Sequence, residues 1–419
     1  MTQGRAVIVG ASHAGAQLCA RLRQQGWAGE ILLIGDEPYL PYQRPPMSKT
    51  YLAAGADIDD LLIRGPEFYT KQDITIRHAR VERIDRAGHQ VVLGDGESIR
   101  YDKLALCLGA RPRALPVPGA DLDGVHYLRT AGDVEAIRES VKGSRRAVIV
   151  GGGYIGLETA ASLRGLGLDV TVLEAADRVL QRVTAPEVSA FFHRIHQAEG
   201  VQVRTGAAVV ALEGAGRVSA VRLADGEEIA ADVVIVGIGV LPNVELAQEA
   251  GLTVQDGVVI DAASRTDDPD IVAAGDCASY HDPRYGRRVR LEAVSSAGEQ
   301  AKVAAATMCG RSEEISALPW FWSDQYDLKL QIAGLNTGYD EVVLRGDPTV
   351  DREFACFYLR QGELIAADCV NRPQEFMFSK RAISQRLRVD VQQLADPGVP
   401  IAAQLTPAAG PVTVSTGVS

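Results

Sequence analysis

The chain has 419 residues, of which 46% are hydrophobic and 23% charged, and its formal net charge at pH 7 is −11. Its length predicts two or three domains, and its composition is that of a globular protein rather than a disordered one. The negative charge argues against nucleic acid as the main partner, and no apolar run reaches the roughly 18 residues that a membrane span needs. Because the opening residues, MTQGRAVIVG, also lack the apolar core of a signal peptide, we expect a cytoplasmic protein without a membrane partner.

A βαβ nucleotide-binding unit is predicted at the start of the chain. RAVIVGASHAG (5–15) is an apolar strand that enters a glycine-rich turn, and a helical pattern and a second buried strand, EILLIGDE, follow it. The pattern Gly10-x-Ser12-x-x-Gly15 has a serine where the dinucleotide fingerprint has its second glycine. Asp36 ends the second strand, at the place of the acid that hydrogen-bonds a ribose. We therefore expect a dinucleotide site here in spite of the serine.

A proline-rich stretch, YLPYQRPPMSK (39–49), comes next and contains no cysteine. Proline fixes its own φ angle and restricts the residue before it, so we expect an extended backbone over residues 41–46. Arg44 and Lys49 place two cations on this loop. The loop is either a rigid, solvated surface segment or one that faces a cofactor.

A second βαβ unit repeats the plan with RAVIVGGGYIG (146–156), which contains the complete fingerprint Gly151-x-Gly153-x-x-Gly156. The first glycine permits a tight turn, the second lets the backbone approach a pyrophosphate, and the third lets helix and strand pack closely. Glu174 closes the next strand about 20 residues later, as the fingerprint requires. Its carboxylate would bond a ribose 2′-OH and repel a 2′-phosphate, so we expect NADH rather than NADPH.

Two hairpins are predicted between and after these units, and each ends in an apolar strand that runs into glycine. The first spans 90–109 and turns at Gly94–Gly96, and the second spans 218–239 and turns at Asp225–Gly226. Two segments that follow them resemble crossings between domains: GARPR (109–113) and GVLPN (239–243).

The next segment, TDDPDIVAAGDCA (266–278), predicts a buried strand that ends at Asp276, from where a carboxylate can reach a long polyol. The alternative is an ordinary strand-terminating aspartate in a turn. LEAVSSAGEQAKVAAATM (291–308) predicts a helix capped at Ser295 or Ser296. The positive end of its dipole would stabilise an anionic group.

Beyond residue 319 the pattern changes to short alternating strands, KLQIAG, EVVLRG, EFACFYL and ELIAADCV, and then to a helix-like run over 373–387. This pattern predicts a smaller α+β domain, followed from about residue 402 by a loosely ordered tail. The six cysteines show neither a CxxC pair nor metal-ligand spacing, so we expect buried free thiols in a reducing cytoplasm and no metal site. The cysteines are residues 19, 107, 277, 309, 356 and 369.

Several motifs together give the chain a resemblance to the FAD-dependent NADH:ferredoxin reductases of oxygenase systems, which are related to apoptosis-inducing-factor-like flavoproteins. The resemblance extends to about residue 390. It depends on RPPMSK (44–49), GGGYIGLE (151–158), RVTAPEVSAF (182–191), AAGDCA (273–278), PWFWSDQY (319–326) and NRPQEF (371–376).

This resemblance implies an α/β fold of the glutathione-reductase type, with two dinucleotide-binding domains and a C-terminal α+β domain. It places an FAD-binding domain in 1–110 and 241–318, an NADH-binding domain in 111–240, the C-terminal domain in 319–402 and the loose tail in 403–419. The start of the helix in 291–308 would then face the flavin N1–C2=O edge.

The resemblance also implies the cofactor contacts. Those with FAD would come from the first glycine turn (Gly10, Ser12, Gly15) and from Ala14, Asp36, Arg44, Lys49, Val81, Arg129, Asp276 and Val294, with Trp322 beside the isoalloxazine ring. Those with NADH would come from the second turn (Gly151, Gly153, Gly156) and from Tyr154, Ile155, Glu158, Glu174 and Gly237. Lys49 and Glu158 would form the catalytic pair near flavin N5.

A function follows from the absence of cysteine in 39–49, because thiol-dependent members of this flavoprotein class carry redox cysteines in this region. Without them the flavin must pass its electrons directly to a partner. The resemblance therefore implies an NADH:ferredoxin oxidoreductase, with hydride transfer from NADH to FAD N5. Single-electron transfers to a [2Fe–2S] ferredoxin follow, and the ferredoxin feeds a haem-thiolate monooxygenase or a Rieske dioxygenase.

An acidic ferredoxin would need a basic face on this acidic chain, and we expect the reductase itself to be a monomer or a weak homodimer. Candidates for that face are Arg64, Lys71, Arg284, Arg287, Arg288 and Arg290. Alternative functions are a rubredoxin or nitrite reductase flavoprotein and a slow redox-signalling flavoprotein of the apoptosis-inducing kind. The sequence pI of about 5.2, the missing targeting segment and the missing basic stripe argue against the signalling alternative.

Overall fold

The computed structural model describes residues 4–54 and 56–404. The part of the predicted loose tail that follows Gln404 lies outside these residues. The chain divides into two compact units. The larger contains residues 1–175 and 199–317, and the smaller contains 176–198 and 318–419. None of the described helices is long and apolar enough to cross a membrane.

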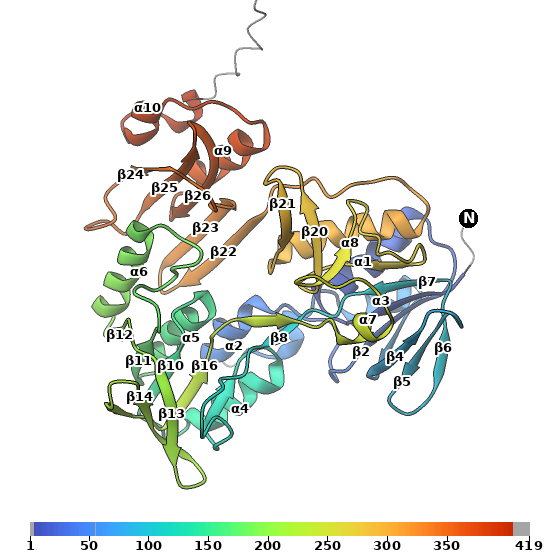
Figure 1. Cartoon of the computed structure of the whole chain (residues 1–419), viewed down its shortest axis with the longest axis horizontal. Coiled ribbons are helices and arrows are strands. Elements are labelled where there is room, and N and C mark those ends of the chain that lie inside the picture. Colours follow the sequence, from blue (N-terminus) through green and yellow to red (C-terminus); the bar gives the residue numbers. More distant parts are fainter. Residues whose placement is uncertain (1–3, 55, 405–419) are drawn as a thin grey trace, which may run out of the picture. The chain divides into compact units, whose positions relative to one another are not determined.

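The first dinucleotide-type sheet of the larger unit has five parallel strands in the order β19-β7-β1-β2-β3 (Figure 1). Parallel strands that are covered on both faces read as continuous apolar runs, which is the pattern of AVIV and ILLIG here. The strands are β1 (Ala6–Val9), β2 (Ile31–Gly35), β3 (Ile74–His78), β7 (Lys103–Leu106) and β19 (Ile271–Ala273).

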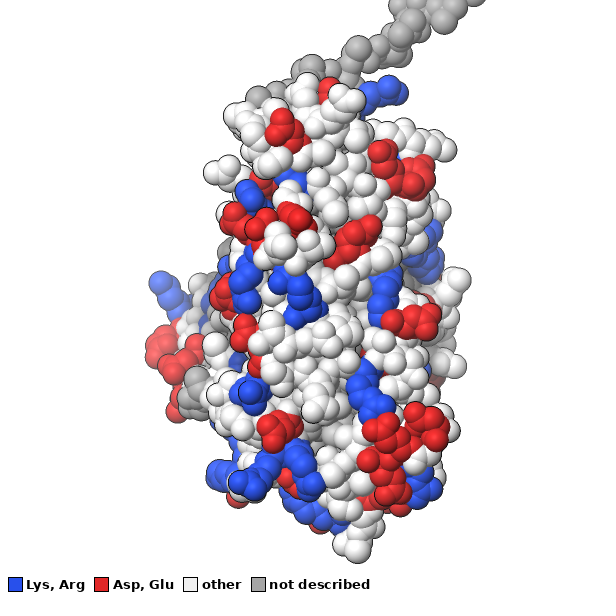
Figure 2. Space-filling model, turned by 90° about the vertical axis from the view of Figure 1, so that its left-hand side faces the viewer, with Lys and Arg blue, Asp and Glu red and all other residues white. Residues whose placement is uncertain are grey.

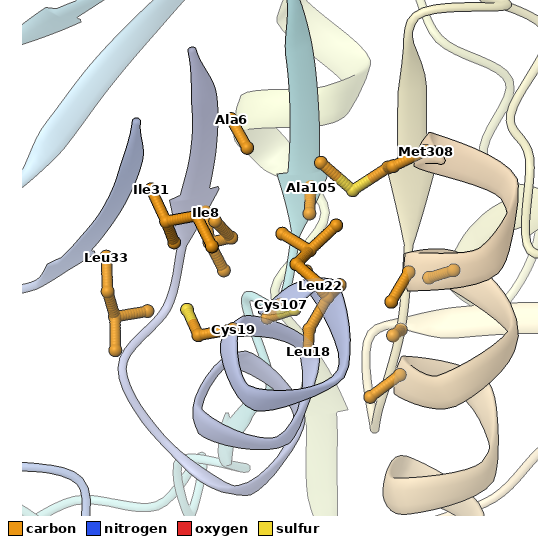
Figure 3. Close-up of a cluster of buried hydrophobic side chains, with 14 of the residues drawn as sticks. Ala6, Ile8, Leu18, Cys19, Leu22, Ile31, Leu33, Ala105, Cys107 and Met308 are labelled. Atoms are coloured by element: carbon orange, nitrogen blue, oxygen red, sulfur yellow. The ribbon is translucent and has the colours of Figure 1, made fainter. Parts of the chain in front are cut away.

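Helices α1 (His13–Gln25) and α8 (Val294–Met308) pack against each other beside this sheet, and their small and apolar side chains form one core with it. Figure 3 shows α1 side chains directed at residues of β1 and β2. Burying an aliphatic side chain of this size contributes about 1.5–3 kcal/mol. The labelled members of this core include Ile8, Leu18, Cys19, Leu22, Ile31, Leu33 and Met308.

The second dinucleotide-type sheet is also parallel, in the order β12-β11-β10-β16-β9. Helix α5 (Tyr154–Gly165) connects β10 to β11, so both predicted βαβ units are present. The strands are β9 (Val125–Tyr127), β10 (Arg146–Val150), β11 (Asp169–Leu173), β12 (Gln202–Arg204) and β16 (Val233–Val236).

Four small sheets, three antiparallel and one mixed, complete the described strands of the larger unit, and both predicted hairpins are confirmed. The two segments predicted as crossings pair with each other, because β8 (Ala110–Pro112) is antiparallel to β17 (Val240–Pro242). The remaining strands are β4 (Val81–Asp85), β5 (Gln90–Leu93), β6 (Ser98–Arg100), β13 (Val209–Gly214), β14 (Val218–Leu223), β15 (Glu228–Ala230), β18 (Val258–Ile260), β20 (Ala278–Asp282) and β21 (Arg287–Arg290). The remaining helices are η1 (Pro45–Ser48), α2 (Thr50–Ala54), η2 (Ile58–Leu61), α3 (Pro66–Lys71), α4 (Ala131–Val141) and α7 (Glu245–Glu249).

The smaller unit is built on an antiparallel sheet in the order β22-β23-β26-β25-β24, as the alternating pattern predicts. Helix α6 (Pro186–Ala198), which precedes this region by more than a hundred residues, belongs to the same unit. The strands are β22 (Trp320–Gln325), β23 (Leu328–Gly334), β24 (Glu341–Arg345), β25 (Phe354–Arg360) and β26 (Glu363–Val370). The other helices are α9 (Pro373–Ser384), α10 (Val391–Ala395) and η3 (Ile401–Gln404).

Two local predictions are wrong. The residue that caps α8 is Ala293, in extended backbone at φ −144°, so Ser295 and Ser296 lie inside the first turn and no side-chain cap is formed. The extended backbone predicted for 41–46 ends at Arg44, which is already helical, because Pro45 begins the 3₁₀ helix η1. Proline is well suited to that first position, since its fixed φ is helical and its missing N–H has no intrahelical partner there.

Candidate active site

The first glycine turn joins β1 to α1 and depends on two glycines for its packing. A Cβ atom on Gly10 would lie 2.0 Å from the Cys107 carbonyl oxygen, and one on Gly15 would lie 2.0 Å from the Gly10 carbonyl oxygen. Gly10 also has a φ of +110°, which other residues rarely adopt. The strand and helix can therefore approach closely only with glycine at both positions.

Ser12, the departure from the fingerprint, is accommodated by a contact with the proline-rich loop. It precedes α1 as the N-cap residue, but its side chain makes no cap hydrogen bond. Its hydroxyl instead accepts a hydrogen bond from Arg44 Nε at 3.3 Å. Arg44 also donates to the Tyr42 hydroxyl at 2.6 Å and forms an ion pair with Glu37, so its guanidinium is held beside the turn.

The second glycine turn joins β10 to α5. Here two glycines are required by the packing of strand against helix, and one is not. Cβ atoms on Gly151 and Gly156 would lie 2.4 Å from the Gly237 oxygen and 2.1 Å from the Gly151 oxygen. A Cβ on Gly153 would meet nothing within 4 Å, and the φ of this residue is an ordinary −80°. The protein itself does not require glycine at position 153, whereas a dinucleotide approaching the start of α5 does.

Two acids follow the second strands of the two βαβ units. The Glu174 carboxylate accepts a hydrogen bond from the Gly152 backbone N–H at 2.7 Å, which holds it at the second glycine turn. Asp36 follows β2 and is exposed. Both lie at the carboxyl edge of a parallel sheet, where the ribose of a dinucleotide binds in this type of unit.

Lys49 and Glu158 form a largely buried ion pair between the proline-rich loop and helix α5. Lys49 Nζ lies 2.6 Å from Glu158 Oε2, and their side chains are 16% and 1% exposed. Lys49 Nζ also donates to the Pro45 carbonyl at 3.1 Å. The Ser48 hydroxyl donates to the same carboxylate oxygen at 2.5 Å. An ion pair this deeply buried is stable only with such additional hydrogen bonds.

Arg129 and Asp276 form a second ion pair, with Arg129 Nη2 at 2.9 Å from Asp276 Oδ2. His13, the first residue of α1, lies within electrostatic range of this pair and of Arg44. Burial lowers the pKa of His13 to about 4, together with the charges of Arg44 and Arg129 and against the opposing effect of Asp276. His13 is therefore neutral at pH 7, and the two cations beside the first turn, Arg44 and Arg129, are each paired with a carboxylate.

The other predicted contacts are distributed over the same unit, with one exception. Ala14 is buried in α1, Val81 begins β4, Val294 begins α8, and Tyr154 and Ile155 begin α5. Trp322 lies on β22 in the smaller unit, so its place beside a flavin stays a prediction.

Four polar residues near the candidate site were not found from the sequence. Ser48 lies within the RPPMSK motif and His13 lies inside the first glycine turn, so the position of each in a motif could have indicated a role at the site. Glu37 and Tyr42 also lie in quoted segments, but their role depends on contacts with Arg44, which the sequence does not reveal. Among the described residues, no group of three or more His, Cys, Asp and Glu is placed to hold a metal ion.

Comparison with known proteins identifies this arrangement. A family model described as pyridine nucleotide-disulphide oxidoreductase matches residues 4–304, and one described as reductase C-terminal matches 320–405. Putidaredoxin reductase of Pseudomonas putida is 45% identical over 402 residues, which cover 94% of this chain and 95% of that protein. A ferredoxin–NAD(P)(+) reductase of Sphingomonas sp. is 44% identical over 405 residues, covering 96% and 97%.

A solved structure agrees with these matches. A chain of the covalent putidaredoxin reductase–putidaredoxin complex matches with a TM-score of 0.92 and 44% identity, over 96% of this chain and 98% of that one. The predicted fold class is thereby confirmed. Likeness of this degree over almost the whole length means that the chain belongs to the pyridine nucleotide-disulphide oxidoreductase family, as a member with the reductase C-terminal domain.

Proposed function

We propose that the protein is an FAD-dependent NADH:ferredoxin oxidoreductase. The observation that carries this proposal is the buried Lys49–Glu158 pair between the cysteine-free loop and the helix of the second glycine turn. A redox thiol has no place in that loop. All six cysteines are free, five of them are buried, and burial raises the pKa of each thiol. Electrons would therefore leave the cofactor directly for a protein partner.

The residues of the two glycine turns fit two dinucleotides, FAD at the first and NADH at the second. Residues 1–110 and 241–318 would form the FAD-binding part, and 111–240 the NADH-binding part. When bound, FAD supplies the chemistry that the protein lacks, because it accepts a hydride from NADH and gives up electrons one at a time. Arg44, with Ser12 and the α1 N-terminus, would bind its pyrophosphate, and Asp36 its ribose.

The catalytic roles belong to Lys49 and Glu158. The ammonium would favour electron density on the neighbouring ring, and the carboxylate would orient that ammonium. Glu174 would select NADH, since its carboxylate bonds a ribose 2′-OH and repels a 2′-phosphate. Lys49 and Glu158 would also exclude water from the reacting groups, because both side chains are largely buried.

The ferredoxin partner is supported by the putidaredoxin and ferredoxin reductases that the chain resembles over almost its whole length. A [2Fe–2S] ferredoxin would carry single electrons to a haem-thiolate monooxygenase or a Rieske dioxygenase. The free thiols suit a reducing cytoplasm. We keep a monomer or weak homodimer as the expected state.

We propose a ferredoxin-docking face built from the six basic candidates except Arg290. Arg290 is only 11% exposed and pairs with Asp256 and Glu292, so it offers a partner little charge. Arg284, Arg287 and Arg288 lie on or beside the β20–β21 hairpin, and Arg64 and Lys71 are exposed on and next to α3. Figure 2 shows a different face of the molecule, on which basic and acidic side chains are interspersed without a large patch of one sign.

The test is cytochrome c reduction by the FAD-loaded protein and NADH, with and without a [2Fe–2S] ferredoxin. We expect ferredoxin-dependent turnover of at least about 1 s⁻¹, within the range of ordinary enzymes. A rubredoxin offered in parallel tests the nearest alternative. Turnover with rubredoxin but not with ferredoxin would identify rubredoxin as the partner. Slow turnover with both acceptors would favour the signalling alternative.

A further inference from the structure

The Ser48 side chain, which no part of the proposed mechanism uses, is 1% exposed and contacts the Lys49–Glu158 pair. It is the last residue of η1, directly before Lys49. Its hydroxyl donates to Glu158 Oε2 at 2.5 Å, the same oxygen that Lys49 Nζ contacts at 2.6 Å. Two donors from neighbouring residues therefore share one carboxylate oxygen of α5.

A second hydrogen bond joins the same two elements. Ser162 lies four residues after Glu158 on α5, so both side chains are on one face of the helix. The Ser162 hydroxyl donates to the Ser48 carbonyl oxygen at 2.8 Å. Ser48 is therefore held to α5 twice, through its hydroxyl by Glu158 and through its carbonyl by Ser162.

From this geometry we infer that Ser48 is a positioning residue, which with Ser162 forms a two-point latch between the FAD loop and the NADH helix. The inference rests on the proposed function and specifies how the Lys49 ammonium is placed. A lysine has a flexible four-carbon stem, so its ion pair alone does not fix the separation of loop and helix. A serine hydroxyl on a single rotatable bond does, because its reach is short and directional.

The latch sets where the ammonium lies when NADH binds at α5. Removing the Ser48 hydroxyl leaves the Lys49–Glu158 contact possible but lets loop and helix shift relative to each other. It also removes one hydrogen bond from the Glu158 carboxylate, which then presents more negative charge to its surroundings. Both changes act on hydride acceptance, and neither removes a group expected to contact NADH.

The experiment compares the FAD-loaded parent with Ser48→Ala, Ser162→Ala and a control, Ser219→Ala, whose exposed hydroxyl bonds the Glu213 carbonyl on a hairpin of the larger unit. Stopped-flow reduction by NADH gives the limiting rate and the NADH Kd. We expect Ser48→Ala to lower the limiting rate about ten-fold, the loss of one hydrogen bond to a charged group, with Kd changed less than about two-fold. Ser162→Ala should cause a smaller fall, and Ser219→Ala should match the parent.

Two further measurements separate positioning from general loosening. The flavin midpoint potential should fall in Ser48→Ala, because the carboxylate is less neutralised, and stay at the parent value in Ser219→Ala. In a Glu158→Gln background, Ser48→Ala should add less than about a two-fold loss, since its partner is already changed. An unchanged potential, a change in Kd alone, or losses that multiply in the double variant would each overturn the latch.

These readouts need NADH and the flavin but no ferredoxin. A parent protein that NADH reduces but that passes no electrons to ferredoxin would overturn the proposed function and still allow the latch to be tested. Parent-like reduction of Ser48→Ala in a protein that does reduce ferredoxin would overturn the latch alone.

Discussion

Replacing Lys49 and Glu158 singly and together should show how much each group contributes to stability and to the flavin potential. At an effective dielectric constant near 20, two unit charges about 4 Å apart attract by about 4 kcal/mol, and desolvation offsets part of this. The pair is short, at 2.6 Å, and unequally buried, since the Glu158 side chain is 1% exposed and that of Lys49 is 16% exposed. The two single variants should therefore differ in stability.

Lys49→Met leaves a deeply buried carboxylate with the Ser48 hydroxyl but without its cation, which should cost about 3–5 kcal/mol in the free energy of unfolding. Glu158→Gln should cost less, about 1–3 kcal/mol, because Lys49 is better exposed and keeps the Pro45 carbonyl. Urea unfolding of the parent, both single variants and the double variant measures these values. The coupling energy should be about 0.5–3 kcal/mol.

The flavin potential gives an independent measure of the same pair. Lys49→Met should lower the midpoint potential and slow reduction by NADH, because the more electron-rich reduced state loses a nearby positive charge. Glu158→Gln should raise the potential, since it removes a negative charge. Strict additivity, or single variants that shift the potential in the same direction, would show that the two groups do not act as a pair at the flavin.

Three other predictions concern cofactor choice, thiols and pH. Glu174→Ala should lower kcat/KM for NADH by a factor that corresponds to about 1–3 kcal/mol, and it should relax discrimination against NADPH. An unchanged ratio of kcat/KM for NADH to that for NADPH would remove Glu174 from that role. Alkylating the reduced enzyme should leave NADH–ferricyanide activity intact, because burial raises the pKa of every cysteine, whereas stoichiometric inactivation would reveal a redox thiol. Burial raises the pKa of Asp368 to about 7, with the Tyr358 hydrogen bond opposing it, so the folded state holds a proton that the unfolded chain releases above about pH 4. Stability should therefore fall between pH 4 and 7 by at most roughly 4 kcal/mol from this group, and urea unfolding of Asp368→Asn should lack that part of the slope.

Hydrophobic periodicity and glycine spacing were sufficient to predict both βαβ units, both hairpins and the α+β character of the C-terminal region. These features depend on local contacts. A buried parallel strand must be apolar along its length, and Gly10 and Gly151 must lack a Cβ because a backbone oxygen lies 2.0 Å and 2.4 Å from where it would be. Such requirements act at single positions, and one chain is enough to recognise them.

Tertiary structure decided the features that join distant segments. Ser48 and Glu158 are 110 residues apart in the chain, so no periodicity relates them, and only the packing of η1 against α5 brings them together. The α8 cap is likewise a property of the backbone path, which is extended at Ala293 and becomes helical at Val294 although two serines follow. The sequence alone therefore determined which cofactor-binding units the chain forms, whereas the fold decided which polar groups meet between them, because those contacts depend on how the elements pack.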